Sequence, residues 1–238
     1  MRHFRLLAFT FSLLTALLLS GSAFADDNLT FTGAGGNNLG GVYTYPYDFT
    51  VNGNSTQLMC DTFNNEIYNG EQWTATESGI PTGSGLFGAT SSANYAAAGL
   101  IFDAMLGVNG VTLGGVVTNS NDANWAVWAL FSSTALNDIT NNTGGFPAGD
   151  TTALAIYNAA LTTADGGVPS SDFTGITIYT PVAGSQNPST DGTPQEFLGY
   201  SAVPEPSELS LLGVLALFGV SGFAFRKRLA PKFALSLQ

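Results

Sequence analysis

Lysine, arginine and histidine are missing from the long middle of the chain. All six Lys and Arg residues lie near the two ends, as does the only histidine, whereas the 17 Asp and Glu residues fall between residues 26 and 208. Nucleic acids and anionic lipid heads are bound through Lys and Arg, because these side chains neutralise phosphate. We therefore expect no nucleic acid partner. The acidity favours solubility, or contact with cationic partners.

The same absences exclude most catalytic chemistry. A Ser-His-Asp triad, a Cys-His pair and the usual zinc site need His, and phosphoryl clamps and Schiff bases need Arg or Lys. Carboxylates remain, and a glycosidase needs only two of them, about 5 to 10 Å apart. This alternative stays open for four residues whose spacing indicates no particular pair: Asp61, Glu66, Glu71 and Glu77. We expect a protein that is not an enzyme and that uses no cofactor or metal.

Cysteine occurs once, at Cys60. A single cysteine cannot form an internal disulfide, which leaves a buried thiol, an intermolecular bridge or special chemistry. The fold must then be held by its apolar core. Residues 26–202 are long enough, and rich enough in apolar and small side chains, to form one domain of this kind.

The N-terminus has the pattern of a secretory signal peptide. Two arginines precede an apolar run over residues 6–19, and Ala23 and Ala25 form the small-x-small triplet that signal peptidase needs. We expect residues 1–25 to be removed on export by cleavage after Ala25. The alternative is an uncleaved anchor helix.

The C-terminus contains a second apolar run, over residues 209–225, which ends at Arg226, Lys227 and Arg228. As a helix it would cross most of a hydrocarbon core of about 30 Å. Because Lys and Arg are retained on the cytoplasmic side, the domain before this helix is expected outside the cytoplasm. Residues 229–238 would then form a short cytoplasmic tail.

The segment before this run begins with Val203, Pro204, Glu205 and Pro206, followed by a short polar gap. Together with the apolar run and the basic cluster, it resembles the PEP-CTERM sorting signal of exopolysaccharide-producing Gram-negative bacteria. The resemblance covers residues 203–228. In that family exosortase, a membrane-embedded enzyme resembling cysteine proteases, recognises the tail.

The resemblance implies a sequence of locations. Pro204, Glu205 and Pro206 would be the recognition element, and residues 226–228 the retention cluster. The protein would first be anchored in the inner membrane of a Gram-negative bacterium, and after processing would reach the cell surface or the extracellular matrix. The tail over residues 229–238 departs from the family, whose members usually end close to the basic cluster. The alternative is an ordinary single-pass anchor.

Local patterns predict strands, then helices, then strands. Aromatic residues alternate with polar ones from residue 43 to residue 51, with Pro46 marking an edge or a bulge, and Gly107 ends a helical pattern. Asp122 would begin the next helix. This order predicts a single exported α+β domain with a mainly antiparallel sheet and about three helices, flanked by the signal peptide and the transmembrane helix. The predicted strands cover 43–51, 57–63, 71–77, 173–182 and 196–203, and the predicted helices cover 92–106, 122–136 and 151–164.

Two short segments, LMCDTF and NWAVWALF, are similar to the thioester domains of bacterial surface adhesins. In that family a Cys motif and a Gln-x-x-apolar-Trp helix supply the two ends of an internal thioester. Cys60 stands at the cysteine place, and Asn124, four residues before Trp128, stands where the family has Gln. Asn is one methylene shorter. The resemblance implies that Cys60 and Asn124 lie close together, and the alternative is a buried structural thiol.

These patterns lead to one main expectation about function. The chain is expected to be an exported cell-surface or exopolysaccharide-matrix protein with a structural or adhesive role. Its expected partners are signal peptidase and exosortase during export, the membrane through residues 209–225, and exopolysaccharide. Two alternatives stay open: a thioester-type adhesin that uses Cys60, and a carboxylate-dependent glycosidase.

Overall fold

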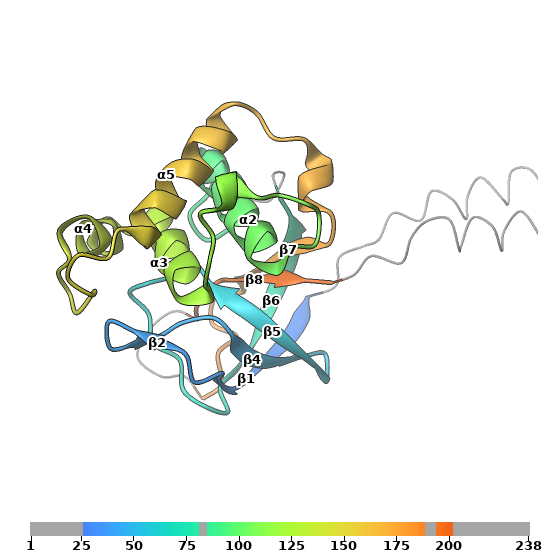
Figure 1. The fold of residues 1–238 in the computed structure, drawn as a ribbon. Coiled ribbons are helices and arrows are strands. Elements are labelled where there is room, and N and C mark those ends of the chain that lie inside the picture. Colours follow the sequence, from blue (N-terminus) through green and yellow to red (C-terminus); the bar gives the residue numbers. More distant parts are fainter. Residues whose placement is uncertain (1–25, 81–84, 189–193, 202–238) are drawn as a thin grey trace, which may run out of the picture. The chain divides into compact units, whose positions relative to one another are not determined.

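The computed structural model describes residues 26–80, 85–188 and 194–201, which form a β-barrel with helices packed against it (Figure 1). The barrel strands follow the order β1-β4-β5-β8-β7-β6, and β6 pairs with β1 to close the barrel. All neighbouring strands are antiparallel. The strands are β1 (Asp27–Ala34), β4 (Tyr47–Val51), β5 (Asn54–Cys60), β6 (Gln72–Gly79), β7 (Ile176–Pro181) and β8 (Phe197–Tyr200). A short ribbon of β2 (Asn38–Leu39) and β3 (Val42–Tyr43) lies in the connection from β1 to β4.

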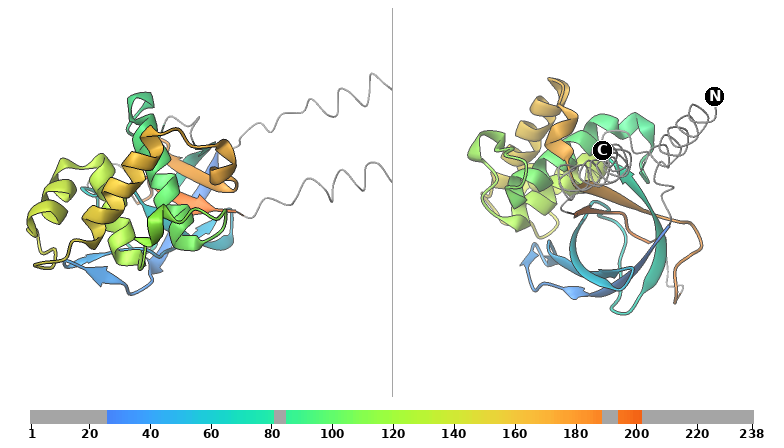
Figure 2. Two further views of the ribbon diagram at one scale, coloured as in Figure 1. Left: turned by 45° about the horizontal axis from the view of Figure 1, so that its top comes forward. Right: turned by 90° about the vertical axis from the view of Figure 1, so that its right-hand side faces the viewer.

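The helices come between β6 and β7 in the chain and lie together on one side of the barrel (Figure 2). The α-helices are α2 (Ser92–Leu106), α3 (Ser120–Phe131), α4 (Ser133–Asn141) and α5 (Thr152–Asp165). Three short 3-10 helices accompany them: η1 (Ala89–Ser91), η2 (Leu113–Gly115) and η3 (Ser170–Phe173). Helix α2 packs against both α3 and α5.

On the strands that face the helices, such as β5 and β8, side chains alternate between the barrel interior and the helical layer. On β5, Leu58 and Cys60 belong to the interior cluster, whereas Met59 belongs to the cluster that contains the helices. On β8, Phe197 faces inward and Leu198 faces the helices. This alternation follows from the two-residue period of a strand. Two of the three hydrophobic clusters of the described residues therefore share the same strands.

Aromatic rings fill the barrel interior. The Phe197 ring centroid lies 4.7 Å from that of Phe49, 5.7 Å from that of Tyr47 and 6.1 Å from that of Trp73. Offset and edge-to-face contacts of this kind stabilise aromatic clusters beyond the area that they bury. Phe197 is therefore central to the barrel core.

The predicted fold class is wrong. Strand β1 was not anticipated, and because it pairs with both β4 and β6, the sheet closes into a barrel. The described residues also contain four α-helices where about three were expected, since the predicted helix over 122–136 ends at Phe131. Ser132 has an extended backbone, and its side chain accepts a hydrogen bond from the Ala135 amide at the start of α4.

Other local predictions agree better with the structure. Helix α2 has the bounds expected from the sequence, and Gly107 ends it with a left-handed backbone at φ 68°. Helix α3 begins earlier than expected, because Asn119 and not Asp122 is its N-cap. The alternating stretch over 43–51 is two strands, β3 and β4, with Pro46 between them.

The predicted signal peptide over 1–25, the sorting signal over 203–228 and the tail over 229–238 lie outside the described residues. Within the described ranges, no helix combines the length and apolarity needed to cross a membrane.

Candidate functional site

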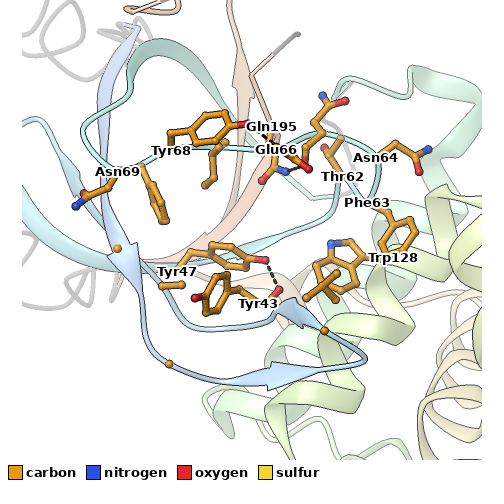
Figure 3. A pocket seen from close by; sticks show the side chains of 18 residues that line it. Tyr43, Tyr47, Thr62, Phe63, Asn64, Glu66, Tyr68, Asn69, Trp128 and Gln195 are labelled. Carbon is orange, nitrogen blue, oxygen red and sulfur yellow. Dashed lines mark hydrogen bonds between the residues drawn. The ribbon is translucent and has the colours of Figure 1, made fainter. Parts of the chain in front are cut away.

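A pocket of about 720 Å³ opens at one end of the barrel. Its wall comes from β1, from the connection that carries β2 and β3, from the start of β4, and from the loop that follows β5. Trp128 of α3 and Gln195, just before β8, complete it (Figure 3). The volume lies within the range of about 300 to 1,000 Å³ that is usual for small-molecule sites.

Tyrosine rings stand on two sides of this pocket. Figure 3 shows Tyr68 on one side and Tyr43 and Tyr47 on the other. The exposed fractions of Tyr43 and Tyr68 are 59% and 53%, the two highest among the exposed large hydrophobic side chains of the described residues. The Tyr47 hydroxyl donates to the Tyr43 carbonyl oxygen at 2.5 Å, which fixes its ring against the β2–β3 ribbon.

Amide side chains supply most of the remaining polarity of the wall, and they are Asn64, Asn65, Asn69 and Gln195. The single charged residue among the lining residues is Glu66, whose Oε2 accepts a hydrogen bond from the Tyr68 hydroxyl at 2.8 Å. Amides both donate and accept hydrogen bonds. The wall is therefore suited to a polar, uncharged ligand.

Cys60 lies behind the pocket, at the end of β5, with no exposed surface. Its Sγ donates toward Gln195 Oε1 at 3.2 Å and accepts from the Thr62 amide at 3.3 Å. Gln195 and Thr62 also line the pocket, so they separate the thiol from it. Burial raises the pKa of the Cys60 thiol above its ordinary value and the Asp61 carboxyl raises it further, whereas the Thr62 amide and the Trp128 indole lower it. The thiol therefore stays protonated at neutral pH.

The structure brings Cys60 and Asn124 together, as the resemblance to thioester domains implied. The contact, however, is with the backbone: Asn124 Nδ2 donates to the Cys60 carbonyl oxygen at 2.8 Å. Asn124 Oδ1 accepts from the Tyr45 amide at 2.7 Å. The side-chain amide that faces Sγ belongs to Gln195.

Sequence reasoning missed Gln195. Its position depends on the pairing of β5 with β8, in which Cys60 lies opposite Phe197. The Gln195 Nε2 group donates to the carbonyl oxygen of Asn65, which orients its Oε1 toward the thiol. The only signal in the sequence was a Gln just before a predicted strand, and that pattern is too common to indicate a site.

Asp61 and Glu196, the neighbours of Cys60 and Gln195 in the chain, form a buried carboxyl pair. Both have an exposed fraction of 0%. Glu196 accepts three hydrogen bonds of 2.6 Å, from the Tyr95 hydroxyl, the Thr180 hydroxyl and the Leu86 amide. Three donors therefore converge on this one buried carboxyl.

Asp61, the second carboxyl of this pair, has fewer hydrogen-bond donors around it than Glu196. Asp61 Oδ1 accepts from the Thr62 hydroxyl at 3.1 Å, but Oδ2 has no donor among the described residues. Burial raises the pKa of Asp61 well above its ordinary value, and the charge of Glu196 and a hydrogen bond with that side chain raise it further. With a proton, Asp61 could donate a hydrogen bond to Glu196. That bond would give Asp61 Oδ2 a partner, and the proton would remove the repulsion between the two carboxyls.

The four carboxylates considered for glycosidase chemistry do not meet in the pocket. Glu66 alone among them lines it, while Asp61 and Glu71 are buried elsewhere and Glu77 contacts the Thr177 hydroxyl on β7. A glycosidase needs a second carboxylate facing the first across its cleft. The geometry of the pocket does not favour that alternative.

In the part of the chain that the structure describes, no group of three His, Cys, Asp or Glu side chains is arranged to hold a metal ion. The residues of the predicted cleavage and sorting signals, from Ala23 to Ala25 and from Val203 to Arg228, lie outside that part.

Comparison of the chain with protein-family models, with curated proteins and with solved structures finds no match.

Proposed function

We propose that the chain is an exported, non-enzymatic adhesive protein of a Gram-negative bacterium, located at the cell surface or in the exopolysaccharide matrix. The observation that carries the adhesive role is the pocket at the barrel mouth, with its exposed tyrosines and its amide wall. A site of this kind can hold a ligand, while its single carboxylate offers little for catalysis.

Targeting rests on the two ends of the sequence. The pattern over residues 1–25 favours export, and the segment from Val203 to Arg228 favours anchoring and processing by exosortase. The absence of Lys, Arg and His between residues 26 and 208 fits a domain that does not contact anionic lipid heads.

Replacement of Pro204, Glu205 and Pro206 by alanine in the native host tests the sorting step. The variant is expected to remain in the membrane fraction, while the control Pro231→Ala is released or transferred like the original chain. Release of the triple variant at the normal rate would exclude a role for this tripeptide.

Retention in the matrix tests the adhesive role. The double variant Tyr43→Ala, Tyr68→Ala removes two exposed rings from the pocket and leaves the core intact. We expect more of this variant than of the original chain in the culture medium. Val108→Ala is the matched control, because Val108 is exposed and does not line the pocket. Equal retention of all three proteins would contradict the proposal.

The second candidate is a thioester-type adhesin, which one distance favours: Cys60 Sγ lies 3.2 Å from Gln195 Oε1. Attack of Sγ on the Gln195 amide carbon would form the thioester, and the Nε2 group would leave as ammonia with the thiol proton. Atoms balance without an oxidant or reductant. A primary amine that entered the pocket could then attack the thioester carbonyl and release the thiol.

Mass spectrometry of the full chain separates these states. A thioester gives a mass lower by one ammonia, and peptide mapping then identifies Gln195 or Asn124 as the partner of Cys60. A chain of unmodified mass that is fully alkylated at Cys60 after unfolding excludes the thioester. The adhesive proposal does not depend on this result.

A further inference from the structure

We infer that the pocket at the barrel mouth binds an uncharged sugar chain, held between its tyrosine rings and by its amide side chains. This inference rests on the proposed adhesive function and adds the chemical class of the ligand.

The placement of the exposed rings is the first argument. Of the large hydrophobic side chains exposed on the described residues, the two most exposed, Tyr43 and Tyr68, both line this pocket. Figure 3 shows Tyr68 across the pocket from Tyr43. The face of an aromatic ring is negative, and the C–H groups on the face of a sugar ring are weakly positive, so the two stack. Rings on two sides can hold a sugar between them.

The amide side chains are the second argument. Asn64 and Asn69 line the pocket and are exposed, whereas both ends of the Gln195 amide already bond within the protein, to Cys60 Sγ and to the Asn65 carbonyl oxygen. A sugar hydroxyl donates one hydrogen bond and accepts others, which matches an amide that offers both a donor and an acceptor. An apolar peptide segment would leave these amides without partners, at a cost in affinity.

The charge of the pocket wall favours neutral sugars over acidic ones. Glu66 is the charged residue of the wall, and the described residues contain no Lys, Arg or His to offset it. A uronic acid polymer would bring its carboxylates toward an acidic surface without any cation to pair with them. Neutral sugars avoid this repulsion, so their binding should depend little on salt.

The volume agrees with this ligand class. About 720 Å³ exceeds the space that one sugar ring needs, so the pocket fits a short stretch of a chain. Trp128 lines the same pocket, which provides a fluorescent reporter close to the ligand.

Titration of the purified full chain in detergent with a panel of oligosaccharides tests the inference. The panel contains neutral hexose oligomers, the acidic polymer alginate, and a short aromatic peptide, with tryptophan emission and calorimetry as readouts. We expect saturable binding of at least one neutral oligomer. Tyr43→Ala or Tyr68→Ala should weaken it about three- to tenfold, as expected for loss of one stacked ring. Tyr68→Phe should keep most of the affinity, and Val108→Ala all of it.

Each other result overturns the inference. Binding of no neutral oligomer, preference for alginate, or neutral binding that both tyrosine variants leave unchanged would exclude a neutral sugar site in this pocket. Peptide binding that requires Tyr43 and Tyr68 would reject the sugar and leave the adhesive function standing. The adhesive function itself fails only if the tyrosine variants are retained normally in the native matrix.

Discussion

Asn124 Nδ2 donates a hydrogen bond of 2.8 Å to the Cys60 carbonyl oxygen, and this bond ties α3 to the end of β5. The other end of the same amide accepts from the Tyr45 amide at 2.7 Å. One buried side chain thus joins α3 to the end of β5 and to the connection between β3 and β4. Buried backbone groups need such partners, because they have lost their contact with water.

Asn124→Ala is expected to destabilise the fold, because it leaves two backbone groups without their partner. Each unsatisfied group costs about 1–3 kcal/mol. Urea unfolding monitored by tryptophan fluorescence measures the loss. Asn158→Ala, at an exposed position of α5, should change the free energy of unfolding by less than about 0.5 kcal/mol. Similar midpoints for the two variants would mean that the Asn124 bonds contribute nothing.

Stability is expected to fall as pH rises above the acidic range, because the pKa of Asp61 is raised in the folded state. The unfolded chain releases this proton near the ordinary Asp pKa of about 4, whereas the folded chain keeps it. The stabilisation that this proton provides is complete below the Asp61 pKa of the unfolded chain. It is lost as the pH rises through the Asp61 pKa of the folded chain. Its slope is at most about 1.4 kcal/mol per pH unit.

Asp61→Asn tests this assignment. Asn offers a neutral N–H donor to Glu196 at every pH, so the variant should show a flatter stability profile between about pH 5 and pH 8. Burial also raises the pKa of Asp122. Asp122 therefore also makes stability fall with rising pH, and it does so equally in the original chain and in Asp61→Asn. Asp165→Asn, at the exposed end of α5, serves as the control and should keep the original slope. An unchanged slope in Asp61→Asn would refute the buried proton.

Phe197→Ala is expected to cost about 3–5 kcal/mol, because it opens a cavity among the rings inside the barrel. Thermal unfolding by circular dichroism is the measurement. Leu86→Ala, whose side chain is 39% exposed, should cost far less. A loss below about 1 kcal/mol for Phe197→Ala would show that the barrel interior is loosely packed.

Ser132→Ala removes the side chain that caps α4 and is expected to cost about 1 kcal/mol. Its neighbour Ser133 is exposed in the first turn, so Ser133→Ala should be neutral or slightly stabilising. Chemical unfolding of both variants gives the comparison. Equal effects of the two substitutions would contradict the capping role.

The sequence predicted local structure better than closure of the sheet. Helix α2 could be found because its apolar spacing and its terminal Gly107 are both local signals. The barrel depends on β1 pairing with β4 on one side and β6 on the other, and no local pattern specifies such distant pairings. The break at Ser132 was hidden, since the apolar residues continue on both sides of it.

The site shows the same limit. Cys60 and Asn124 were selected from motifs, and the structure places them in contact through the Cys60 backbone. Gln195 could not be selected, because only the register of β5 against β8 brings it to the thiol. The tyrosines of the pocket looked like one face of a strand, yet Tyr43 and Tyr47 belong to different strands.

Closure of the barrel has a consequence for contacts between copies of the chain. Each of its six strands pairs with a neighbour on both sides, so no barrel strand stands wholly at a free sheet edge, the position at which a second chain could add a strand. An open sheet with the same exposed tyrosines would invite self-templated aggregation. Contacts between neighbouring copies should therefore be made mainly by side chains.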